Sequence, residues 1–459
     1  MSEYVTIVDG KEVLVERGRQ KFSGKWAIDQ CTIGDNSLRT GYYQTAIDGP
    51  APRFLDTNKD APVPGCTITG STGSGKSNQL ANLLIQEAYN GNGFCLIDKA
   101  PWETALSLLE GIPNNRVRDV IWIDVTAAGH ANNRVGIGKD QIVPFNPISI
   151  QSIRQNLEFS NAISNDISHI ITSILLNKKT PKGGCFGMEN LISSLIKSEL
   201  EYDLMDLYEV IIGSVDGREL ADSDPYISKN MLDSVWNGEI DWGLHAHRIT
   251  ELLLGNVDSI LSKENNSIDI PSAIENDNII VFLGSDSTQL STDRIKLVSS
   301  TFIRQFKSYL IGKDSLSSQY IVGIEWAGDF FDHHGKIFST IFDDSTSPLY
   351  PFFVFQYPSQ LPKSCRETLL NSTSTNITFQ LGDTLLKSHY KNINRTGAEP
   401  LSELFDVGGS VIPNLGIGHY LMKNFNEDAL YGYSFAPLPS KRSTQNMKLE
   451  LGSNYDIIY

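Results

Sequence analysis

The sequence has few cysteines and none of the pairings that would make them structural. Its 459 residues include five, which are Cys31, Cys66, Cys95, Cys185 and Cys365. They lie far apart, form no CxxC pair and are odd in number, which argues against a disulfide framework or a zinc ribbon. Cys66 and Cys95 lie inside apolar runs and are expected to be buried small hydrophobic side chains.

Long apolar runs are also missing. No stretch approaches the roughly 18 uninterrupted apolar residues of a membrane span. Residues 1–18 contain neither an apolar signal core nor a cleavage site. We therefore expect a cytoplasmic protein with no intrinsic transmembrane segment, whose recruitment to the inner face of a membrane would need a partner.

Positive charge is scarce. The chain has 38 lysines and arginines against 54 aspartates and glutamates, which is a formal net charge of -16. Because non-specific DNA affinity comes largely from neutralised phosphates, such a chain cannot coat DNA with its whole surface. Short basic clusters lie at 16–21, 177–182 and 441–442, and each is more readily explained as a solvated surface run than as a DNA site.

The sequence does contain a series of short, continuously apolar runs, at 65–70, 93–98, 120–125, 278–284, 320–325, 351–356 and 376–382. Continuous rather than alternating hydrophobicity predicts strands buried on both faces, as in a mostly parallel sheet covered by helices. Two connecting segments carry a helical apolar face, formed by Leu80, Leu83, Leu84 and Ala88 and by Ile295, Val298, Phe302 and Phe306. The predicted fold class is therefore α/β and doubly wound.

The distribution of these runs also predicts domains. Residues 48–65 are rich in proline, glycine and aspartate and indicate a loop before the core begins. The strand runs stop between about 155 and 255, where the pattern becomes helical. The predicted parts are a β-rich lead-in (1–60) with a hairpin turn at Asp9-Gly10, a first core part (61–154), an inserted all-helical domain (155–255), a second core part (256–435) and a polar tail (436–459).

A phosphate-binding loop follows the first apolar run. Gly70-x4-Gly75-Lys76-Ser77 matches the G-x4-GK[ST] pattern and lies between a strand and an amphipathic helix, as that pattern requires. Small residues let backbone N–H groups converge on phosphates, and the helix adds its positive N-terminal end. Lys76 would reach the β- and γ-phosphates, and the Ser77 hydroxyl would ligate Mg2+. The predicted nucleotide-binding residues are Gly70, Ser71, Thr72, Gly73, Ser74, Gly75, Lys76, Ser77 and Asn78.

Three polar residues end apolar runs, at the edge where ligands gather in open α/β sheets. Glu325 is placed to hold the metal and its water shell, and Gln356 to contact the γ-phosphate. Asp98 is either a structural cap or a part of the same site.

Beyond the loop, the segments 70–126, 143–148, 252–285 and 355–383 resemble the strands and turns of one family. It is the FtsK–HerA superfamily of ring ATPases, and specifically the coupling ATPases of type IV secretion and conjugation. The resemblance covers roughly residues 60 to 385, and the helical insertion lies where these proteins place an all-helical domain. It implies a RecA-like P-loop NTPase core.

The resemblance also implies an activity and partners. The implied cofactors are ATP and Mg2+, bound between neighbouring subunits. The implied assembly is a homo-oligomeric ring, usually a hexamer, with DNA passing through its lumen. Secretion-channel or relaxase-type proteins are the implied protein partners. A basic lumen could coexist with an acidic exterior.

The sequence departs from the family pattern at the strand end that carries the catalytic acids. The family strand normally ends Asp-Glu, with the Asp for magnesium and the Glu as the base that polarises water. Here Glu325 stands in the first position and Trp326 in the second, and an indole cannot act as a base. Asp329 is the nearest acid that could replace the missing base, followed by Asp332. The predicted catalytic residues are Lys76, Glu325, Asp329 and Gln356, and the predicted metal ligands are Ser77 and Glu325.

No residue stands out as an arginine finger, although Arg304 and Arg366 are candidates. His333 and His334 could suggest a metal site, but a solvated helix start explains them better.

Three functions stay open at this point. The first is an ATPase that translocates DNA in a conjugation-like or secretion-like system. The second is a nucleotide-binding structural or regulatory subunit with a degenerate catalytic site. The third is a viral DNA-packaging ATPase.

Overall fold

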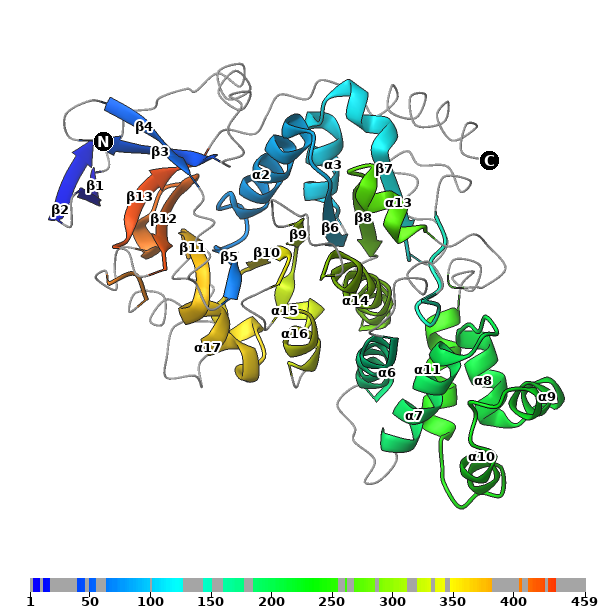
Figure 1. The fold of residues 1–459 in the computed structure, drawn as a ribbon. Helices are drawn as coiled ribbons and strands as arrows, with labels where there is room; N and C mark the ends of the chain where they lie inside the picture. Colours follow the sequence, from blue (N-terminus) through cyan, green and yellow to red (C-terminus); the bar gives the residue numbers. More distant parts are fainter. Residues whose placement is uncertain are drawn as a thin grey trace.

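An eleven-stranded mixed sheet forms the centre of the computed structural model (Figure 1). The strand order is β4-β3-β13-β12-β11-β5-β10-β9-β6-β8-β7. The structure describes residues 3–8, 11–16, 39–45, 49–54, 63–99, 101–126, 143–150, 160–176, 185–254, 261, 268–284, 289–311, 320–331, 335–342, 347–381, 404–406, 412–425 and 428–434. The predicted tail and the basic clusters at 177–182 and 441–442 lie outside these residues, as do 17–21 of the first cluster.

The seven apolar runs form the parallel part of this sheet, which confirms that they are strands. They are β5 (Val63–Thr69), β6 (Phe94–Lys99), β7 (Val120–Asp124), β8 (Ile279–Gly284), β9 (Tyr320–Ile324), β10 (Leu349–Phe355) and β11 (Thr373–Phe379). Every pairing among them is parallel. Alternate side chains enter two different hydrophobic clusters, so both faces are buried, as in other parallel sheets.

Four antiparallel strands extend the sheet beyond β11, and the sequence patterns did not predict this extension. They are β12 (His419–Asn424), β13 (Leu430–Tyr433), β3 (Arg39–Thr45) and β4 (Gly49–Phe54). A separate antiparallel pair, β1 (Glu3–Val8) and β2 (Lys11–Glu16), confirms the hairpin predicted around Asp9-Gly10.

Helices cover both faces of the parallel strands (Figure 1). One face packs against α2 (Lys76–Asn90) and α3 (Glu103–Gly111), and the other against α14 (Gln289–Ile311). The predicted apolar faces of α2 and α14 are buried, as expected. The remaining elements of the core are η1 (Asn114–Asp119), α13 (Ile270–Glu275), α15 (Ala327–Phe330), α16 (Lys336–Ile341), η4 (Pro358–Gln360), α17 (Lys363–Ser372) and η5 (Ile412–Asn414).

A helical segment lies beside this core. It consists of α6 (Ser160–Leu176), α7 (Cys185–Lys197), α8 (Leu204–Ile212), α9 (Val215–Ser223), α10 (Lys229–Trp236) and α11 (Gly243–Leu253). Within it, the Asp203 carboxylate caps the N-terminus of α8, and Gly213, with φ of 64°, ends this helix. Within the described ranges no helix has the length and apolar character of a membrane span.

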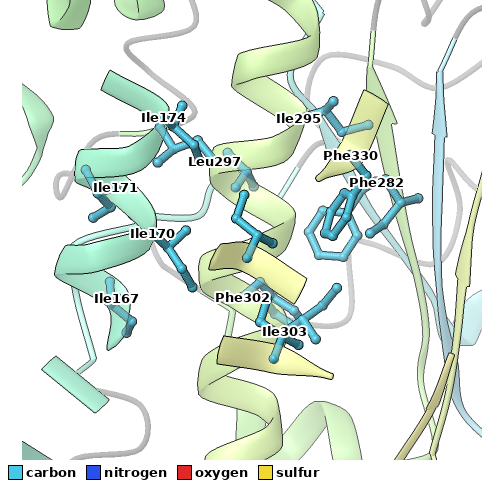
Figure 2. Close-up of a cluster of buried hydrophobic side chains, with 14 of the residues drawn as sticks. Ile167, Ile170, Ile171, Ile174, Phe282, Ile295, Leu297, Phe302, Ile303 and Phe330 are labelled. Atoms are coloured by element: carbon cyan, nitrogen blue, oxygen red, sulfur yellow. The ribbon is translucent and has the colours of Figure 1, made fainter. Parts of the chain in front are cut away.

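The core helix α14 joins the helical segment to the sheet (Figure 2). Its residue Leu297 lies toward α6, while Phe302 approaches Phe282 of β8 with 5.2 Å between ring centroids. Phe302 is fully buried and also lies 5.4 Å from Phe145. Phe302 of α14 thus packs against both β8 and the segment that contains Phe145.

We expect Phe302→Ala to lower the free energy of unfolding by about 3 to 5 kcal/mol, because it leaves a cavity between α14 and the sheet. Urea unfolding followed by circular dichroism measures this change. Ile311→Ala, at the exposed end of the same helix, is the control and should change stability by less than about 0.5 kcal/mol. Equal losses in the two variants would contradict the expectation.

Candidate functional site

The phosphate-binding loop turns sharply between β5 and α2. Gly73 and Gly75 have φ angles of 78° and 113°, in the left-handed region that favours glycine. A Cβ atom at Gly70 would lie 2.4 Å from Ser74 Oγ and 2.8 Å from Phe379 Cβ, so only glycine fits there without a shift. The loop conformation therefore follows directly from its glycine spacing.

Residues distant in the sequence hold the loop from outside. The backbone N–H and the hydroxyl of Ser71 donate to the Gln380 carbonyl, at 2.9 and 2.8 Å. The Gly418 N–H donates to the Ser74 carbonyl at 3.1 Å. Gln380 follows β11 and Gly418 precedes β12, so the adjoining ends of these two strands support the loop. The sequence analysis identified neither residue.

The start of α2 is suited to an anion. Helix N-termini carry unpaired N–H donors and a partial positive charge. In α2 no side chain caps these donors, and no acidic residue lies in the first turn. Gly73 is exposed, and a Cβ there would meet nothing within 4 Å. The Ser74 hydroxyl is buried and has no hydrogen-bond partner among the described residues.

Two oppositely charged side chains lie near each other beside this helix start. Lys76 and Glu325 are only 7% and 6% exposed. Burial lowers the pKa of Lys76, while the nearby charges of Glu325 and Glu103 act in the opposite direction. Burial raises the pKa of Glu325, and the Thr104 hydroxyl, Lys76 and Ser77 oppose this rise. The Thr104 hydroxyl donates to Glu325 Oε1 at 2.6 Å.

Asp98 has a structural contact close to this pair. Its carboxylate accepts a hydrogen bond of 2.9 Å from the backbone N–H of Ala105, in the first turn of α3. Burial raises the pKa of Asp98 well above its usual value, and the negative charge of Glu325 adds to the rise. Asp98 is thus a helix cap and also an electrostatic neighbour of the site.

Gln356 contacts the phosphate-binding loop from the end of a neighbouring strand. Its side-chain amide donates to the Thr72 hydroxyl at 3.1 Å, and its backbone N–H donates to Gln360 Oε1 at 2.7 Å. Gln356 therefore reaches the phosphate-binding loop from the end of β10.

Trp326 takes an unusual backbone conformation at the end of β9. Its φ of 60° is in the left-handed region, which costs a non-glycine residue on the order of 1 kcal/mol. Its ring centroid is 6.0 Å from Lys76 Nζ and 5.5 Å from Lys99 Nζ, within range of cation–π attraction. Lys99 also forms an ion pair of 2.5 Å with Asp329, the predicted substitute base.

The arginine candidates are occupied within the chain. Arg304 pairs with Asp166 of α6 at 2.5 Å, and Arg366 donates to the Leu361 carbonyl at 2.9 Å. His333 and His334 lie outside the described residues. Among the residues that the structure does describe, no group of three or more His, Cys, Asp or Glu side chains could hold a metal ion. A metal at Ser77 and Glu325 would therefore need ligands from phosphate or water.

The sequence analysis missed Lys99, Glu103 and Thr104, which the structure brings to the site. Lys99 is the last residue of β6, and Glu103 and Thr104 are the first two residues of α3. Their position after a strand end was a usable signal, because the carboxyl ends of parallel strands meet at one edge.

Cys66 and Cys95 are buried in the sheet as predicted. Burial raises the pKa of both thiols well above the usual value. They are therefore packing residues rather than reactive ones.

Another strand end, Asp124 of β7, is buried and accepts a hydrogen bond from the Thr126 N–H at 2.9 Å. Burial raises its pKa to about 6. Because this lies above the roughly 3.9 of an unfolded Asp, its carboxyl group favours folding most below about pH 4. That contribution is lost as the pH rises through 6.

We therefore expect Asp124→Asn to be more stable than wild type at pH 7, by on the order of 2 kcal/mol, with the gain fading between about pH 6 and pH 4. Thermal unfolding over this range measures it. Asp222→Asn, at an exposed ion pair with Lys229, is the control and should show no such gain. A gain that does not change with pH would contradict the assignment.

The sequence and the structure were compared with those of known proteins. No family model and no curated protein matches the sequence. Solved structures do match. The bacterial conjugative coupling protein TrwBdeltaN70, unbound monoclinic form, is similar with 11% identity over 96% of each chain and a TM-score of 0.56.

Two further structures of this coupling protein agree. The trigonal form with sulphate has 12% identity over 94% of this chain and 96% of that one, with a TM-score of 0.57. TrwB in complex with ADP and Mg2+ has 12% identity over 97% and 98%, with a TM-score of 0.56. This chain therefore has the α/β fold of conjugative coupling proteins, as the sequence resemblance predicted.

Proposed function

We propose that this chain is an ATPase that couples nucleotide hydrolysis to DNA translocation in a conjugation-like or type IV secretion-like system. The observation that carries the proposal is the convergence of Lys76, Ser77 and Glu325 beside an uncapped helix start, with Gln356 on the loop. The fold supports it, because TrwB, a coupling protein, has been solved with ADP and Mg2+.

The residues of the site fit a nucleotide triphosphate with Mg2+. The Ser74 hydroxyl has no partner among the described residues, and no side chain caps the N–H groups at the start of α2. Lys76 is buried beside these donors, where a phosphate would offset the cost of its burial. Ser77 and Glu325 would hold the metal, which supplies charge neutralisation of the phosphates when bound.

The other residues of the site would orient the reacting groups. Gln356 would hold a γ-phosphate oxygen from the end of β10, since its amide already reaches Thr72. Thr104 orients the Glu325 carboxylate through its 2.6 Å hydrogen bond. Asp329 remains the proposed substitute base, and its carboxylate forms an ion pair with Lys99.

The proposed assembly is a homo-oligomeric ring, with six subunits favoured and DNA in the lumen. The net charge of -16 supports an acidic exterior, so that the positive charge needed for DNA would be confined to the lumen. The proposed location is the cytoplasm, next to a membrane-bound channel or a relaxase-type partner.

One observation favours a second function, which is nucleotide binding without turnover in a structural or regulatory subunit. Trp326 occupies the position of the missing base, and its ring lies near the ammonium groups of two lysines. An indole accepts no proton from water, and loss of a positioned base costs about 10²- to 10⁴-fold in rate.

Steady-state ATP hydrolysis with and without DNA distinguishes the two functions. We expect wild type to turn over ATP faster with DNA than without it, and Lys76→Ala to show neither binding nor turnover, because it loses the phosphate-binding cation. Asp329→Ala should abolish turnover but keep binding if Asp329 is the base.

The outcome that would sink the translocation proposal is a wild type that binds ATP without hydrolysing it, together with a gain of turnover in Trp326→Glu. Thermal unfolding of each variant shows whether it is folded. Loss of ATP binding in wild type itself would remove both proposed functions.

A further inference from the structure

Lys99 is a nearly buried lysine at the centre of the sheet edge that carries the site. It ends β6, whose neighbours are β9 and β8, and it is 7% exposed. A buried ammonium group is costly unless an anion pairs with it. Its partner in this structure is Asp329, at 2.5 Å.

The indole of Trp326 connects Lys99 to the phosphate-binding loop. The ring lies 5.5 Å from Lys99 Nζ and 6.0 Å from Lys76 Nζ. The left-handed backbone of Trp326 is held by N–H groups of Asp329 and Phe330, which donate to the Trp326 carbonyl at 2.8 and 3.3 Å. The ring position is therefore set by the backbone, and both ammonium groups lie beside one aromatic side chain.

The two partners of the Lys99 ion pair differ in burial. The Lys99 side chain is 8% exposed, whereas that of Asp329 is 52% exposed. Water screens a carboxylate this exposed, so the ion pair contributes little and its loss is easily compensated. Lys99 needs an anion far more than Asp329 needs a cation, and a better anion could displace the carboxylate.

We propose that Lys99 is a second phosphate-binding cation of this site, and that it exchanges Asp329 for the γ-phosphate of a nucleoside triphosphate. This inference rests on the proposed nucleotide-binding function and adds, beside Gln356, a cation that would distinguish triphosphate from diphosphate. Lys76 would also contact the β-phosphate that both nucleotides share, whereas Lys99 would contact only the γ-phosphate. While no γ-phosphate is present, the Asp329 carboxylate pairs with Lys99 beside Trp326.

The exchange also accounts for the unusual Trp326. A glutamate at this position would pair with Lys76 and Lys99 and compete with a phosphate for both. An aromatic ring attracts the same cations without a formal charge and leaves them available to an anion.

The test is equilibrium binding of a non-hydrolysable ATP analogue and of ADP, each with Mg2+, measured by calorimetry. We expect Lys99→Gln to weaken binding of the analogue by about 10- to 100-fold, the size of a lost charged hydrogen bond, and to leave ADP within about threefold. Asp329→Asn should tighten the analogue by up to about fivefold, because the competing carboxylate is gone.

Two controls keep the result interpretable. Lys229→Gln removes the lysine of an exposed ion pair with Asp222 and should change neither affinity. If Lys99→Gln does not fold, as judged by thermal unfolding without nucleotide, Lys99→Met keeps the aliphatic stem and loses only the charge.

The proposal is overturned if Lys99→Gln and Lys99→Met bind the analogue as wild type does, or if they weaken the analogue and ADP equally. Weaker analogue binding in Asp329→Asn would also overturn it. A folded wild type that binds neither nucleotide would instead refute the proposed nucleotide-binding function. Lys99 variants that keep the wild-type preference for the triphosphate analogue would refute only the role of Lys99.

Discussion

The whole site depends on two opposite charges kept out of water, the Lys76 ammonium and the Glu325 carboxylate. Burial disfavours the charged form of each group, and each opposes that effect in the other. Such a pair is stable only where further hydrogen bonds satisfy it, which here come from Thr104 and Ser77. The first turns of α2 and α3 lie at this point, and they supply these partners.

The support for this site reaches into the helical segment through α14. Lys296 donates to the Phe331 carbonyl, which follows the short α15 after Trp326, and Lys307 donates to the Ile341 carbonyl at the end of α16. At the N-terminal end of α14, Arg294 donates to the Leu252 carbonyl of α11 at 2.8 Å. One buried helix therefore contacts both the backbone behind the nucleotide site and the end of the helical segment.

Features that depend on neighbouring residues were predictable from the sequence. The glycine positions of the loop follow from local sterics, because Gly70, Gly73 and Gly75 stand where a side chain would clash or strain the backbone. The seven parallel strands were predictable because continuous apolar runs can be buried only on two faces. Glu325 and Gln356 were identified because polar residues that end such runs must lie at one edge of the sheet.

Features that depend on the register and direction of strands were not predictable in this way. The Gly418 contact to the loop exists because β12 pairs antiparallel with β11, and nothing in the local pattern at 412–425 sets that pairing. The pairing of Lys99 with Asp329 joins residues 230 positions apart, through adjacent ends of β6 and β9. By itself the sequence determined the glycine positions of the loop and which runs would be buried, since both follow from local chemistry. Only the tertiary structure decided which charges meet, because strand order sets the distances between them.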